Sequence, residues 1–220
     1  MVVELIPVIE LHYPHPSIPV PDKFPYWNYA ALWDAYHAAC HSQAGFADPL
    51  PAYLAGSSFC RLPEITPRNL AKLVADHTQE LRAGTYERDQ ASGFWGGYVL
   101  QVGGKAAFFP QCCGQLSDMV YWERLAQGQP SYYEGHPAPT VTLNGDSLVL
   151  DFSVGEFDEP FQPPPPPAVE LSRAALQQAV AQAKQELQLF AQRLKEINAA
   201  AGLEIQDIDK LLIWSDGKHA

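Results

Sequence analysis

The sequence predicts an α+β fold: an antiparallel sheet, helices packed on one face of it, and a long C-terminal helix after a polyproline linker. Three observations lead to this class. Short alternating apolar stretches are joined by Gly-Gly or Asn-Gly, which is typical of antiparallel hairpins. Other segments carry apolar residues three and four positions apart between capping residues, which indicates helices. The C-terminal part is rich in Ala, Gln, Leu and Lys, all good helix formers.

The first expected elements are a strand and a helix joined by an extended crossing. Val2 to His12 alternates and is rich in branched residues, so it is expected to form a strand. Prolines at positions 14, 16, 19, 21 and 25 then favour an extended path. Tyr26 to Gln43 has apolar residues on many sides, which predicts a helix buried over much of its circumference. Asp48 to Glu64 is expected to be a loop, with a short strand near Phe59.

The second expected helix has clear start and stop signals. Thr66 can accept hydrogen bonds from free amides, and Pro67 suits the first helical position. Gly84 can adopt the left-handed conformation that ends a helix. The apolar face of this helix is predicted to contain Leu70, Leu73, Val74, His77 and Leu81.

Paired glycines predict the first hairpin. Phe94 to Val102 and Lys105 to Phe109 flank Gly103-Gly104, where positive φ angles cost little. After this hairpin, Ser117 is expected to cap a short helix that runs to Ala126 and stops near Gly128.

The second hairpin is predicted by a turn at Asn144-Gly145. Thr140 to Leu143 precedes the turn and Ser147 to Val154 follows it. The second strand alternates cleanly, so one of its faces is expected to be covered. That face is predicted to contain Leu148, Leu150, Phe152 and Val154.

A stiff linker is expected to lead into the C-terminal helix. Pro163 to Pro167 favours a polyproline rod of roughly 15 Å at about 3.1 Å per residue. Val169 to Ala201 is expected to be helical, with Gly202 as its stop. Its apolar residues alternate steps of four and three, which is a seam of the heptad type, formed by Leu176, Val180, Ala183, Leu187, Phe190, Leu194 and Ile197.

These segments suggest one main domain with an appended helix. Residues 1–162 are predicted to form an α+β core, residues 163–168 the linker, and residues 169–220 a helical segment packed on the core. The helical seam must be covered, and we favour the protein's own sheet and helices over a second copy of the chain, so both a monomer and a homodimer stay open. The tail from Ile205 to Trp214 is apolar enough for a final helix or an edge strand.

Charge and composition restrict the functional classes. Lys and Arg total 14 against 25 Asp and Glu, a formal net charge of −11. Coulomb repulsion therefore disfavours nucleic acid and anionic membrane as partners, and a basic protein partner fits better, although such a charge also serves solubility alone. No apolar run approaches the about 20 residues of a membrane span, and the first residues lack the basic flank of a secretory leader. Four sparse cysteines predict reduced thiols, so we expect a cytoplasmic protein.

One helical face carries residue types that bind metals. Asp34, His37 and His41 occupy positions i, i+3 and i+7 of the first predicted helix, so a carboxylate and two imidazoles could face one divalent ion. No HExxH pattern accompanies them. Hydrogen-bonded or exposed histidines are the alternative interpretation.

The adjacent thiols Cys112 and Cys113 lie between an expected strand and an expected helix. Amides at the start of that helix could lower the pKa of a thiol and stabilise an oxyanion. A nucleophilic cysteine also needs a base within hydrogen-bond reach, and the candidates are His77 and His136. Redox or metal use of the pair is a second interpretation, and a tightly packed loop with buried thiols is a third.

Two functional hypotheses from different classes follow. The negative charge and the aromatic content favour a protein-binding module, as an immunity or antitoxin-like factor would be. The alternative is an enzyme that depends either on a metal at Asp34, His37 and His41 or on a thiol at Cys112 or Cys113. No cofactor other than that divalent metal is expected, since neither GxGxxG nor a Walker lysine motif is present. The serine-nucleophile motif GxSxG is also absent. A purely structural role would rest on the long C-terminal helix as an oligomerisation element.

Overall fold

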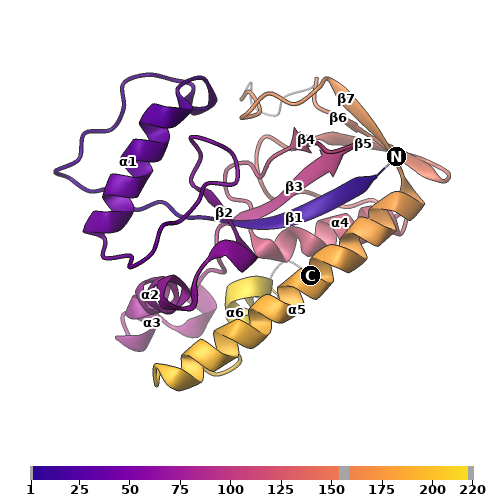
Figure 1. Cartoon of the computed structure of the whole chain (residues 1–220). Helices are drawn as coiled ribbons and strands as arrows, with labels where there is room; N and C mark the ends of the chain where they lie inside the picture. Colours follow the sequence, from indigo (N-terminus) through magenta and orange to yellow (C-terminus); the bar gives the residue numbers. More distant parts are fainter. Residues whose placement is uncertain (1, 154–158, 218–220) are drawn as a thin grey trace.

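The computed structural model describes residues 2–153 and 159–217, which form two antiparallel sheets and six α-helices (Figure 1). The strands are β1 (Val3–Glu10), β2 (Phe59–Arg61), β3 (Gly96–Val102), β4 (Lys105–Phe108), β5 (Thr140–Asn144), β6 (Ser147–Asp151) and β7 (Ala168–Ser172). The α-helices are α1 (Ala30–Gln43), α2 (Pro67–His77), α3 (Gln79–Arg82), α4 (Met119–Ala126), α5 (Arg173–Ala200) and α6 (Ile208–Trp214). The predicted α+β class is therefore confirmed.

The larger sheet has the strand order β2-β1-β3-β4 and is antiparallel throughout. The first strand is central, and it pairs with β3 from Val3↔Val102 to Ile9↔Gly96. The predicted Gly103-Gly104 turn joins β3 to β4, and both glycines have positive φ angles of 59° and 78°. The predicted first hairpin is confirmed.

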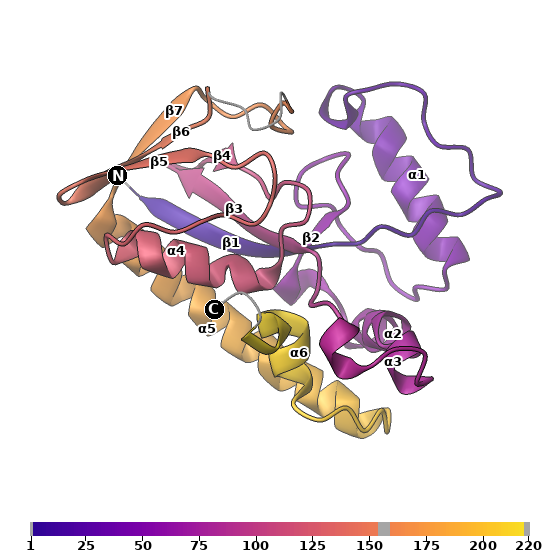
Figure 2. The ribbon, with the colours of Figure 1, turned by 180° about the vertical axis from the view of Figure 1, so that it is seen from behind.

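Helices cover one face of this sheet. Figures 1 and 2 show α4, α5 and α6 on the same side of β1 and β3. Val3, Leu5 and Ile9 of β1 join the helices in the main core. The opposite face carries a smaller apolar cluster, in which Val8 and Val99 pack against the loop that precedes β2. Side chains of β1 therefore point alternately to the two faces of the sheet and contribute apolar residues to the clusters on both faces.

The smaller sheet, β5-β6-β7, contains a strand that the sequence analysis placed in a helix. Residues 168–172 pair with β6, with Leu148 opposite Leu171 and Leu150 opposite Val169. The prediction of a helix from Val169 was wrong for residues 169–172. Their hydrogen bonds to β6 outweigh the helix propensity expected from the composition of this segment. The helix α5 begins at Arg173 instead.

The predicted alternation of the second hairpin is confirmed, but its turn lies one residue later. Leu148 and Leu150 are fully buried. Asn144 pairs with Ser147, so the two-residue loop is Gly145-Asp146, and Gly145 supplies the positive φ of 58°. The strand β6 ends at Asp151, so Phe152 and Ser153 of the predicted strand are not part of it. Val154, the predicted end of the strand, lies outside the described residues.

The seam of α5 is buried by the protein's own chain, as predicted. Six of its seven members are buried, from Leu176 to Leu194, and Ile197 is partly buried against the same core. The helix packs along β1, α4 and α6 (Figure 1). The apolar tail forms α6, which is the helical alternative of the two considered.

The α2 helix has the predicted cap. Thr66 Oγ1 accepts a hydrogen bond from the Asn69 amide, and Pro67 is the first helical residue. The helix ends at His77, because Thr78 leaves helical geometry with φ of −100° and ψ of 8°. The hydroxyl of Thr78 donates to the Val74 carbonyl, and the short α3 follows before Gly84.

Two local predictions were wrong. The α1 helix is not buried around much of its circumference: its buried residues are Trp33, Tyr36, Cys40 and His41, and Leu32 is 44% exposed. The reason is its position beyond the β2 edge, away from both sheets (Figures 1 and 2). Ser117 does not cap α4, since it lies inside the 3₁₀ turn η4 (Leu116–Asp118), which is capped by reciprocal bonds between Gln115 and Asp118.

Within the described ranges, no helix combines the length and the apolar character that a membrane crossing requires.

Candidate functional site

A cavity of about 870 Å³ lies where the end of β1, the segment before α1 and the loop after β4 meet. Both adjacent thiols line it, together with His136 and Glu159. Aromatic side chains form much of the rest, namely Phe24, Tyr26, Trp33, Phe59 and Trp95. The two predicted thiols therefore face a space large enough for a small molecule or a protein side chain.

The loop after β4 that carries Cys112 and Cys113 is attached to the larger sheet through Gly114 and Gly96. The Gly114 carbonyl accepts a hydrogen bond from the Gly96 amide at 2.9 Å, and the Gly114 amide donates to the Gln111 carbonyl at 3.1 Å. A Cβ on Gly114 would lie 2.6 Å from the Gly96 carbonyl oxygen. Only glycine permits this close approach, so the loop geometry depends on residue 114.

The backbone of Cys113 brings the two thiols together. Successive side chains of an extended chain point to opposite sides, but Cys113 has a φ of 69°, which is uncommon for a residue with a side chain. Its Sγ atom lies 3.4 Å from Sγ of Cys112. Both residues are exposed. Strain of this kind costs about 1–3 kcal/mol and is concentrated at functional sites.

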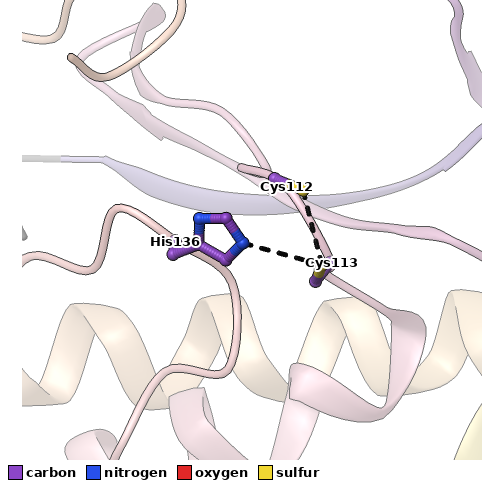
Figure 3. A group of neighbouring side chains, drawn as sticks. All are labelled: Cys112, Cys113 and His136. Atoms are coloured by element: carbon purple, nitrogen blue, oxygen red, sulfur yellow. Dashed lines mark hydrogen bonds between the residues drawn. The ribbon is translucent and has the colours of Figure 1, made fainter. Parts of the chain in front are cut away.

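A histidine and a carboxylate complete a chain of contacts from Cys113. The Nε2 atom of His136 lies 3.8 Å from the Cys113 sulfur (Figure 3). The Nδ1 atom of His136 lies 2.8 Å from Oε2 of Glu159. A carboxylate only accepts, so Nδ1 carries the proton and Nε2 presents its lone pair to the thiol.

Two further contacts position the histidine and the carboxylate. The amide of His136 donates to the Cys112 carbonyl at 3.0 Å. The buried side chain of Gln111 donates to the Gln162 carbonyl at 3.1 Å and accepts from the Gln162 amide at 2.9 Å. Gln111 therefore ties the segment that carries Glu159 to the loop that carries the thiols.

The surroundings of Cys112 disfavour its thiolate form. The hydrogen bond with Cys113 raises the pKa of the Cys112 thiol, and burial and the negative charges of Glu159 and Glu10 add to the increase. Cys112 is therefore held in its neutral form. Cys113 is the thiol that contacts the imidazole, so it is the better candidate nucleophile.

The predicted metal ligands Asp34, His37 and His41 line a second cavity of about 590 Å³ beside α1, and His37 also lines the first cavity. The Asp34 carboxylate accepts a hydrogen bond from the Gly56 amide at 2.7 Å. Nε2 of His41 lies 3.2 Å from the Leu11 carbonyl, so this nitrogen carries a proton and offers no lone pair. Burial lowers the pKa of His37 and of His41. Metal binding by these three residues stays a prediction.

The two candidate bases have different surroundings. Nε2 of His77 lies 3.0 Å from the Ser92 carbonyl, and its ring packs on Phe94. His136 is the candidate that meets the thiols. Amides at the start of the following helix were expected to assist the thiol, but the Gln115 amide already donates to Asp118 Oδ2 at 3.0 Å.

Sequence reasoning missed Glu159 and Gln111 as members of the site. The Glu159 side chain is about half exposed. His136 and Glu159 are 23 residues apart in sequence, so their contact leaves no local sequence pattern.

Comparison with protein-family models, with curated proteins and with solved structures finds no match for this chain.

Proposed function

We propose that this protein is a cysteine-dependent enzyme in which Cys113 is the nucleophile, His136 the base and Glu159 the residue that orients the base. The observation that carries the proposal is the chain of contacts from Sγ of Cys113 through the imidazole to the carboxylate. Nucleophile, base and orienting group in this order are the arrangement of thiol hydrolases and acyltransferases. The cavity beside Cys113 provides room for a substrate.

The reaction supported by these groups is acyl transfer. The Cys113 sulfur attacks a carbonyl carbon, and the thiol proton moves to Nε2 of His136. A sulfur–carbon bond forms, and the bond to the leaving group breaks. The leaving group takes the proton from His136, and water then releases the acyl group from sulfur with the same histidine as the base.

The charge of the cavity favours a cationic or neutral substrate. Glu10 and Glu159 line it, and none of its described lining residues is Lys or Arg. Aromatic faces next to carboxylates bind positive groups well. A carbonyl compound with a neighbouring cationic group is therefore the expected substrate class.

The proposal predicts a covalent acyl adduct on one defined thiol. Metal-free, reduced protein incubated with an activated acyl ester is expected to gain one acyl group on Cys113, detected by mass spectrometry of its peptides. Cys113→Ser is expected to lose the adduct. Cys112→Ser is the matched control, because it keeps the contact between Cys113 and His136. An adduct on Cys112 alone, or equal labelling of both cysteines, would reject the assignment.

Protein binding is the second candidate function, favoured by the exposed aromatic rim of the same cavity. Phe24 is 64% exposed and Trp95 is 43% exposed, and both line the cavity next to Glu10. Aromatic anchors beside negative charge suit a segment of a basic partner, as in the immunity or antitoxin-like role expected from the sequence.

This second function predicts that one charge reversal at the cavity weakens the binding of a basic partner. Partner capture with the wild-type protein, followed by reconstitution with the purified partner, is expected to give a salt-sensitive complex. Glu10→Lys and Trp95→Ala are expected to weaken that complex at least tenfold. Glu170→Lys, an exposed change on β7, is the matched control. Equal affinity of the wild type and Glu10→Lys would remove the cavity as the binding surface.

A further inference from the structure

We infer that Cys112, Cys113 and His136 form a binding site for a soft divalent cation of the zinc class, open to the cavity at its fourth coordination position. These are the one group of His, Cys, Asp and Glu side chains in the described ranges whose donor atoms lie close enough to hold a single ion. Thiolate and imidazole are the ligands that zinc prefers.

The distances between the donor atoms fit a tetrahedral centre. With Zn–S of about 2.3 Å and Zn–N of about 2.0 Å, tetrahedral geometry places two sulfur ligands about 3.8 Å apart and a sulfur and a nitrogen about 3.5 Å apart. The two Sγ atoms lie 3.4 Å apart, and Sγ of Cys113 lies 3.8 Å from Nε2 of His136. All three donor atoms lie within 4.8 Å of one another. Rotation of the two exposed cysteine side chains toward His136 would close this set around an ion.

The surroundings of the imidazole also match a metal ligand. Metal-binding histidines commonly donate their second ring nitrogen to a carboxylate, which fixes the tautomer and the ring orientation. The bond from Nδ1 of His136 to Glu159 does this and leaves Nε2 free toward the sulfur atoms. The same tautomer would serve a general base, so the geometry supports both uses.

The local charge favours a cation. Glu10 and Glu159 line the same cavity as the three ligands, and none of its described lining residues is Lys or Arg. The negative potential of these carboxylates stabilises a divalent ion at this place. Cys112, which has no role in the proposed acyl transfer, gains one here as a ligand.

Metal binding would switch off the nucleophile. A sulfur atom that donates its lone pair to zinc and an imidazole that ligates through Nε2 cannot take part in acyl transfer. This regulatory consequence rests on the proposed function, whereas the metal site itself does not.

Cobalt and zinc titrations of reduced, metal-free protein test the site without any enzyme assay. We expect one equivalent of Co²⁺ to bind with the charge-transfer absorption of a cobalt–thiolate bond, and Zn²⁺ to displace it. Cys112→Ser, Cys113→Ser and His136→Ala are each expected to weaken the affinity at least tenfold. Glu159→Gln is expected to weaken it about tenfold through the orientation of His136. His12→Ala removes another histidine of the same cavity and is the matched control.

The outcomes separate this inference from the proposed function. Absence of cobalt–thiolate absorption, or equal weakening by His12→Ala and His136→Ala, overturns the metal site even if Cys113 accepts an acyl group. Cobalt binding with the expected variant pattern establishes the site even if no acyl adduct forms. If both hold, one equivalent of Zn²⁺ is expected to block acylation of the wild type. Cys112→Ser, which keeps the nucleophile and loses a ligand, is expected to resist that block.

Discussion

Replacing Phe190 by alanine is expected to lower the free energy of unfolding by about 3–5 kcal/mol. This side chain is 1% exposed and lies in the seam of α5, where its ring packs near Phe94 with centroids 6.2 Å apart. Its removal opens a cavity between the long helix and the rest of the core, which rigid neighbours fill only in part. Urea denaturation followed by circular dichroism measures the change.

Leu189→Ala is the matched control for this prediction. It is the preceding residue of the same helix, but it is 70% exposed. Its removal is expected to change the free energy of unfolding by less than about 0.5 kcal/mol. Equal losses for the two variants would mean that the seam does not face the core.

The second large effect concerns the pH dependence of stability. Burial raises the pKa of the Asp118 carboxyl from 3.8 to about 7. Between these values the folded protein keeps a proton that the unfolded chain has lost, so stability falls as the pH rises through this window. A shift of this size corresponds to about 4 kcal/mol at most. Asp118→Asn cannot ionise, and its amide oxygen can still accept from the Gln115 amide, so it is expected to avoid this loss.

The prediction is checked by unfolding both proteins at pH 4 and at pH 8. The stability of Asp118→Asn relative to the wild type is expected to increase by up to about 4 kcal/mol between these values. Asp22→Asn, a change at an exposed acidic residue, is expected to show no such increase. A constant difference between Asp118→Asn and the wild type would show that Asp118 is already ionised in the fold.

Most of the fold could be predicted because its signals are local. The Gly103-Gly104 turn, the Thr66 cap and the heptad seam of α5 each follow from residues within one element. The third strand of the smaller sheet could not be predicted this way. Residues 168–172 form a strand because the edge of β6 provides partners, and this preceding strand is separated from them in sequence by the proline-rich segment.

The adjacent thiols of the candidate site could be predicted from the sequence, but their partners could be narrowed only to two histidines. The adjacent cysteines are conspicuous in the sequence, and His136 was one of two candidate bases. The choice between His136 and His77 depends on tertiary contacts: one imidazole meets a thiol, and the other meets the Ser92 carbonyl. Glu159 enters the site through the hydrogen bonds between Gln111 and Gln162, which no sequence pattern shows.

The central claim is that the imidazole of His136 activates the sulfur of Cys113, and the acylation rate of Cys113 in metal-free protein tests it most directly. General bases contribute factors of about 100 or more, so His136→Ala is expected to lower this rate at least about 100-fold at neutral pH. His12→Ala, which alters another imidazole of the same cavity, is expected to leave it unchanged. Equal rates for the wild type and His136→Ala, with both proteins folded, would contradict the account.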